Sequence, residues 1–123
     1  MKAKQNNRQG ASVVELAFVL PIILLFFFSA WEWSRVEMIK QVAETASFEA
    51  ARLGKIPGMS NDDIEARAQE ILDTYMIFDA SVVANVTSTR SHVWLGVPLD
   101  QNTWITSRIF KGRLVDTSTT ITK

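Results

Sequence analysis

The sequence predicts an α+β fold, in which a long N-terminal membrane-spanning helix continues as a stalk and is packed by a second amphipathic helix and a small antiparallel sheet. Three observations predict it. An uninterrupted apolar run covers residues 16–28, a helical apolar period continues to Leu53, and alternating β-branched residues begin after Asp79. The 123 residues leave room for one small domain beyond the long helix.

Residues 11–33 are predicted to form a transmembrane helix. At about 1.5 Å per residue such a helix is roughly 34 Å long, which is enough to cross the apolar core of a bilayer. The first ten residues contain basic side chains and no acid, and Trp31 and Trp33 close the apolar segment as an interfacial aromatic belt would. We therefore expect a cytoplasmic N-terminus and an extracytoplasmic C-terminal part.

An ordinary cleaved signal peptide has the same basic start and an apolar segment of similar length. Two features favour an anchor instead. Glu15 lies inside the apolar segment, where a carboxylate costs about 2 to 3 kcal/mol of insertion free energy. The small-residue site downstream, residues 28–30, begins with a bulky Phe. A secreted binding domain behind an ordinary signal peptide remains as an alternative.

The segment from Gly10 to Glu15, Gly-Ala-Ser-Val-Val-Glu, resembles the type IV prepilin cleavage signature, in which a cut follows the Gly and a Glu is the fifth residue of the mature chain. Residues 12–21, Ser-Val-Val-Glu-Leu-Ala-Phe-Val-Leu-Pro, look most like the TadE-like pseudopilins of tight-adherence (Flp-type) pili. The likeness extends over roughly residues 8–55. It implies that a prepilin peptidase removes residues 1–10 by cutting between Gly10 and Ala11.

The resemblance also implies a function. The chain would be a minor pseudopilin, a structural and assembly subunit of a tight-adherence type IV pilus or related secretion machine. Its partners would be the prepilin peptidase, other pilin or pseudopilin subunits, the inner-membrane pilus assembly platform and the lipid bilayer. Before assembly it would be a single-pass protein of the inner membrane, and afterwards part of the pilus or cell surface. An uncleaved membrane accessory protein of the same machinery is the alternative, and the mature N-terminus, Ala11 or Met1, separates the two.

Two residues of the span have predicted roles. An acid in low dielectric is either neutralised or paired. By resemblance to type IV pilins, Glu15 would pair with the α-amino group of a neighbouring subunit and set the axial register. Pro21 has no N–H to donate to the carbonyl oxygen of Ala17, so a bend or a loosened turn is expected there.

The helix is predicted to continue as an extracytoplasmic stalk over residues 34–55. Apolar residues recur at alternating spacings of three and four and form a packing seam with three alanines, which permit close approach of another element. The seam packs either against the chain's own domain or against a neighbouring subunit. Its members are Val36, Ile39, Ala43, Ala46, Ala50 and Leu53.

Residues 56–123 are predicted to form a small α+β distal domain. Ser60 and Asp63 form a capping-box-like start to a second helix over about residues 62–76. Two or three antiparallel strands are expected at residues 82–86, 93–97 and 114–121. Residues 102–110 fit a short helix as well as a strand.

Composition bears on the remaining classes of function. Basic and acidic residues number 13 each, so the charge balance gives no electrostatic footprint for nucleic acid, which would need a clustered basic face. The chain has no cysteine and a single histidine, His92, and it carries no hydrolase, zinc-protease or phosphate-loop motif. We therefore expect no catalytic site, cofactor or metal, and a chain that is the substrate of an enzyme.

Overall fold

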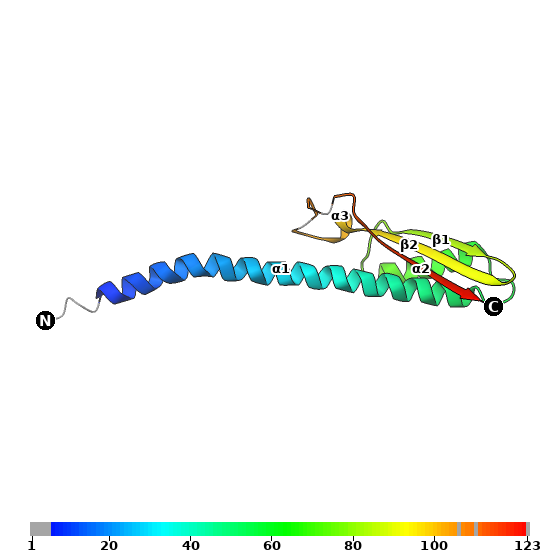
Figure 1. The fold of residues 1–123 in the computed structure, drawn as a ribbon, viewed down its shortest axis with the longest axis horizontal. Helices are drawn as coiled ribbons and strands as arrows, with labels where there is room; N and C mark the ends of the chain where they lie inside the picture. Colours follow the sequence, from blue (N-terminus) through cyan, green and yellow to red (C-terminus); the bar gives the residue numbers. More distant parts are fainter. Residues whose placement is uncertain (1–5, 106, 110, 123) are drawn as a thin grey trace. The chain divides into compact units, whose positions relative to one another are not determined.

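The computed structural model describes residues 6–105, 107–109 and 111–122, with side chains described from Gly10 onward. Residues 1–5 of the predicted ten-residue leader, including Lys2 and Lys4, therefore lie outside the described residues. The chain divides into two compact units, residues 1–33 and 34–123, which are described separately. A long apolar helix, a second helix and a three-stranded antiparallel sheet confirm the predicted α+β class (Figure 1).

Helix α1 is a single element from Asn6 to Leu53 and therefore contributes to both units. It begins before the predicted start at residue 11, and it continues through Pro21 without interruption. Its C-terminal end is a short series of turns, in which the Lys55 and Ile56 amides donate to the carbonyl oxygens of Arg52 and Leu53. Arg52 lies in the last turn, where a cation interacts favourably with the helix dipole.

Helix α2 runs from Asn61 to Thr74 and is capped at both ends. The predicted Ser60–Asp63 capping box is present: the Asp63 amide donates to Ser60 Oγ over 3.2 Å, and the Ser60 amide donates to Asp63 Oδ2 over 3.1 Å. At the other end the Ile77 amide donates to the Leu72 carbonyl oxygen, and Met76 adopts a left-handed conformation with φ 55°. This is the Schellman geometry, here with Met in place of the usual Gly.

The sheet contains β1 (Ser81–Val86), β2 (Arg90–Pro98) and β3 (Leu114–Thr122), in the order β1-β2-β3 with both pairs antiparallel. The β1–β2 connection is tight, since the Thr87 amide donates to the Arg90 carbonyl oxygen over 2.8 Å. All nine residues of β2 are paired with β3, from Arg90 opposite Thr122 to Pro98 opposite Leu114.

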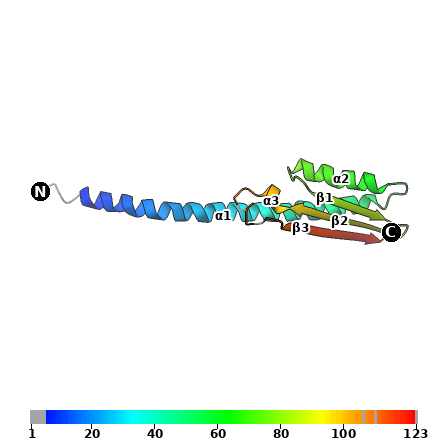
Figure 2. The same cartoon turned by 90° about the horizontal axis from the view of Figure 1, so that it is seen from above.

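The core of the second unit lies between the sheet and the two helices. In Figures 1 and 2 the α1 part of this unit lies along one face of the sheet, and α2 lies beside β1. Alternate residues of β2 point to that face and are fully buried, as period-two alternation requires. The fully buried large side chains are Ile39 of α1, Ile64 and Leu72 of α2, Ile77, and Val93, Leu95 and Val97 of β2.

The stretch at residues 102–110, which fitted both a helix and a strand, follows the short helix α3 (Leu99–Asn102). Only Asn102 of that stretch is helical, and its other described residues form bends, turns or irregular chain. The Leu99 amide donates to the Arg113 carbonyl oxygen over 3.0 Å, so the ends of the 99–113 segment meet. We call this segment the closed loop. It connects β2 to β3 and has the dimensions of an Ω-loop.

Candidate functional site

The predicted cleavage site lies within α1. Gly10 and Ala11 are both helical and exposed, and among the described residues, apart from its chain neighbours and the backbone of its own helix, no group lies within 4 Å of the position that a Gly10 Cβ would occupy. Glu15 is exposed four residues after Ala11, and residues at this spacing share one face of a helix. A new α-amino group at Ala11 would therefore lie one turn from the Glu15 carboxylate of the same chain.

The first unit presents an apolar surface to its surroundings. Large apolar side chains are exposed throughout residues 13–28, for example Phe18 at 75% and Phe26 at 70%. Trp31 and Trp33 follow, each 68% exposed. This helix is long and apolar enough to cross a membrane, and none of its most apolar window is buried. An apolar helix with this exposure indicates membrane anchoring.

The residues of the predicted seam face the interior of the second unit. Val36 and Leu53, at its ends, are partly buried and pack against the core. At the middle of the seam the Ser47 hydroxyl lies 2.8 Å from Thr119 Oγ1 of β3, so α1 and the sheet approach closely. Alanine permits this approach, because a larger side chain would hold the helix away from the strands. The four fully buried members are Ile39, Ala43, Ala46 and Ala50.

A buried asparagine connects three segments of the second unit. Asn102 is 3% exposed; its Nδ2 donates to the carbonyl oxygens of Phe78 (2.9 Å) and Pro98 (2.8 Å), and its Oδ1 accepts from the Phe78 amide (2.9 Å). Arg35 of α1 adds a connection, since its Nε donates to the Asn102 carbonyl oxygen and its Nη2 to that of Met76, each over 3.4 Å. We call these residues the Asn102 clamp. It holds the turn after α2 and the start of the closed loop beside Arg35.

Helix α2 covers the outer edge of β1. The Ala84 amide donates to Glu65 Oε1 over 2.8 Å, and the Val86 amide donates to Asn61 Oδ1 over 3.1 Å. These two amides are on the side of β1 that has no strand neighbour, where unpaired N–H groups would favour pairing with another chain. Side chains of α2 therefore satisfy an edge that the sheet itself leaves open.

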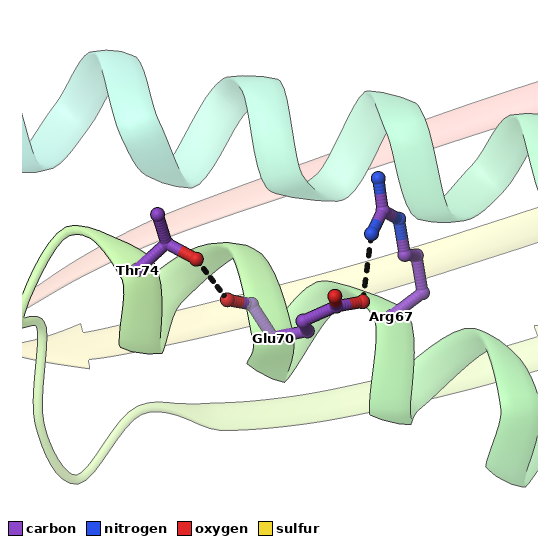
Figure 3. A network of polar contacts seen from close by, with 3 residues as sticks. All are labelled: Arg67, Glu70 and Thr74. Atoms are coloured by element: carbon purple, nitrogen blue, oxygen red, sulfur yellow. Dashed lines mark hydrogen bonds and ion pairs between the residues drawn. The ribbon is translucent and has the colours of Figure 1, made fainter.

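The polar contacts on the surface of α2 add little stability. Figure 3 shows Arg67 Nη1 donating to Glu70 Oε2 over 2.7 Å, and Thr74 Oγ1 donating to the Glu70 carbonyl oxygen over 2.8 Å. The two charged side chains are 43% and 66% exposed, and exposed ion pairs typically contribute below about 1 kcal/mol. These contacts support the helix locally and leave its exposed side solvated.

The Asn102 clamp and the cover over β1 are the features that sequence patterns did not predict. Asn102 lies in the stretch with an ambiguous pattern, and its partners at residue 78 are distant in sequence. His92, the one histidine, is exposed on β2 opposite Asn85 and Thr120. Within the described residues no group of three or more His, Asp or Glu side chains is arranged to hold a metal ion.

The comparisons with known proteins bear on α1. Residues 10–52 match the family model described as TadE-like protein, which confirms the resemblance inferred from the sequence. The matched region extends from Gly10 to the last turn of α1, so α2 and the sheet lie outside it. The search of curated proteins and the search of solved structures gave no match. The family implies a protein associated with the Tad pilus.

Proposed function

We propose that this chain, TadE-like over residues 10–52, is a minor pseudopilin of a tight-adherence pilus or a related secretion machine. It is held in the inner membrane by α1 and is a structural subunit, a substrate of prepilin peptidase and not itself an enzyme. The observation that carries the proposal is the combination of the family match with the exposed apolar surface of residues 13–28. That surface needs lipid, or the helices of other subunits, to cover it.

The division of α1 supports this role. Its first part presents apolar side chains outward, whereas the seam of its second part is buried within the chain's own small domain. The two parts therefore suit different partners. The first part passes from lipid into a bundle of subunit helices on assembly, while the second keeps its own sheet and α2.

Glu15 supplies the register in this proposal. The Glu15 carboxylate is exposed on an otherwise apolar stretch of helix, so it needs water, a proton or a cation when the helix enters a bundle. The α-amino group of Ala11 on a neighbouring subunit is such a cation, with an unperturbed pKa near 8. A wrong stagger leaves both charges unpaired in low dielectric, and this penalty favours the correct one.

Cleavage is tested by the intact mass of the protein extracted from membranes. In a host with the peptidase, the mature chain is expected to begin at Ala11. Gly10→Phe should leave the chain unprocessed, because a bulky side chain replaces the glycine of the signature. A Met1 chain in a competent host would instead support the uncleaved accessory protein, and an N-terminus near Trp31 would support the ordinary signal peptide.

Assembly is tested with Glu15→Val, which removes the charge and keeps the helix apolar. We expect membrane insertion and cleavage to be preserved and incorporation into pili to be lost. Glu44→Val is the matched control, since Glu44 is exposed on the same helix but lies well beyond the span. If the Glu15→Val chain is incorporated as well as the control, Glu15 does not set the register.

A further inference from the structure

The closed loop carries a surface that the proposed function leaves unused. Trp104 is 93% exposed and Ile109 is 75% exposed. Arg108, Lys111 and Arg113 are exposed in the same segment, and residues 101–113 contain no acid. Exposed aromatic and aliphatic side chains interspersed with cations are typical of segments that lie in the interface of an anionic membrane.

A second segment lies next to the closed loop and is also apolar and exposed. Met76 and Phe78 are 68% and 60% exposed, respectively. Both Met76 and Asp79 have positive φ, at 55° and 56°, a conformation that L side chains rarely adopt. The Asn102 clamp holds this turn in place by bonding both the amide and the carbonyl oxygen of Phe78. Strain retained in an exposed turn is common at sites of binding.

Arg35 places both segments near the point where the chain enters the membrane. Its guanidinium donates to the carbonyl oxygens of Asn102 and Met76, so both segments lie at the level of Arg35 in the second unit. Arg35 follows Trp33 by two residues in the same helix. If Trp31 and Trp33 lie in the interface, as the proposed function requires, the second unit begins next to the membrane, and its first residues are the ones that bond to both segments.

We propose that the closed loop and the turn at residues 76–78 form a membrane-surface contact that binds anionic phospholipid. Trp104 and Ile109 enter the interfacial region, while Arg108, Lys111 and Arg113 contact lipid phosphates. Lipid is the occupant that fits both the apolar and the cationic parts of this surface, and Arg35, which bonds to both segments, follows the predicted membrane span directly in sequence. The contact rests on the proposed membrane anchoring and extends it: the small domain is held against the bilayer until the subunit is extracted.

The test uses the full chain in nanodiscs made of phosphatidylcholine alone or of equal parts of phosphatidylcholine and phosphatidylglycerol. Lipids brominated near the headgroup quench interfacial tryptophan, and the difference between the chain and its Trp104→Phe variant isolates Trp104. We expect strong quenching of Trp104 in the anionic discs, weaker quenching in neutral discs, and a further decrease at high salt. Little or no dependence of Trp104 quenching on lipid charge or salt would overturn the role of the cations.

Substitution of the cations tests the contact directly. Arg108→Gln, Lys111→Gln and Arg113→Gln together should weaken docking by roughly two orders of magnitude at low salt, at about fivefold per basic side chain. Lys55→Gln is the matched control, because Lys55 is exposed in the turns that follow the C-terminal end of α1, away from Arg35. The control should leave Trp104 quenching unchanged, and an equal loss in both variants would overturn the assignment. The salt series on the unmodified chain tests the contact even if the triple variant folds poorly.

The fourth tryptophan, Trp94, lies in β2, so this comparison is made in a Trp94→Phe background. The quenching that then remains in Trp104→Phe reports Trp31 and Trp33, which separates this inference from the function it rests on. If those residues are quenched and Trp104 is not, the chain is anchored and the closed loop does not bind lipid. If neither is quenched, the anchor itself is absent and the proposed function fails. Protection of Trp104 by a second copy of the chain, seen as quenching that falls with rising protein-to-disc ratio, would also overturn the lipid contact.

Discussion

Asn102→Ala should destabilise the second unit more than any surface change in the closed loop. The substitution removes one acceptor and two donated hydrogen bonds from a side chain that is 3% exposed. It leaves the Phe78 amide and the carbonyl oxygens of Phe78 and Pro98 without that partner. A lost buried hydrogen bond costs about 1 kcal/mol net, and an unsatisfied buried group costs about 1 to 3 kcal/mol. We therefore expect a loss of roughly 2 to 4 kcal/mol in the free energy of unfolding.

Amide hydrogen exchange of the full chain, followed by mass spectrometry of peptides from β2, measures this loss. In the regime where exchange reports the opening equilibrium, 2 kcal/mol corresponds to about a 30-fold faster exchange, since each 1.4 kcal/mol is a factor of ten. Gln101→Ala is the control, because Gln101 precedes Asn102 in α3 and is exposed. Exchange in Asn102→Ala within about twofold of this control would refute the argument.

Asn102→Asp separates the hydrogen bonds from the loss of volume. An ionised aspartate keeps the acceptor for the Phe78 amide but sets a negative charge against two carbonyl oxygens, those of Phe78 and Pro98. The loss at neutral pH should equal or exceed that of the alanine variant. It should decrease at acidic pH, where a protonated carboxyl group can donate one hydrogen bond. Because aspartate has nearly the volume of asparagine, a pH-independent loss well below that of the alanine variant would show that packing volume, not hydrogen bonding, is the cause.

Three further predictions concern other parts of the chain. Gly54→Ala should lower the free energy of unfolding by about 1 to 3 kcal/mol, because the added Cβ would meet Ser91 Oγ and lie 2.7 Å from Ser91 Cβ. In a double-mutant cycle measured by chemical denaturation, Ser91→Gly should recover part of this loss. Hydrogen bonds from the Ser60 side chain and amide lower the pKa of Asp63 in the folded chain. The stability that Asp63 contributes is therefore fully present above the pKa of an unfolded aspartate, about 4, and is lost as the pH falls through the lowered pKa. Asp63→Asn should remove this pH dependence of the free energy of unfolding. Pro21→Ala should straighten or tighten α1, and distances measured between spin labels on either side of residue 21 should detect the change. Unchanged distances together with unchanged pilus assembly would show that Pro21 is merely tolerated.

Periodic features of this chain were predictable because burial of one face repeats along a regular element. The alternation of Val93, Leu95 and Val97 predicted a strand, and all three are fully buried in β2. The capping box was readable because Ser60 and Asp63 are three residues apart. Each of these signals is local, so no knowledge of the rest of the fold was needed.

The contacts that sequence reasoning missed are single polar pairs between distant segments. Glu65 bonds an amide 19 residues later in the chain, and Asn102 bonds one 24 residues earlier. Such pairs leave no repeat in the sequence. A glutamate at position 65 that pointed into solvent would give the same pattern of neighbouring residues as one that bonds to β1. The start of α1 at Asn6 was missed for another reason. The helix continues into polar residues that no apolar period marks.

The contact between Ser47 and Thr119 has a kinetic consequence. The two hydroxyl groups are separated by 72 residues, so the alanine face of α1 is synthesised long before β3 can cover it. Contacts of such large sequence separation form slowly, because the entropy of closing the loop is lost before the contact is gained. Until β3 forms, the alanine face of α1 that it later contacts therefore stays uncovered on that side.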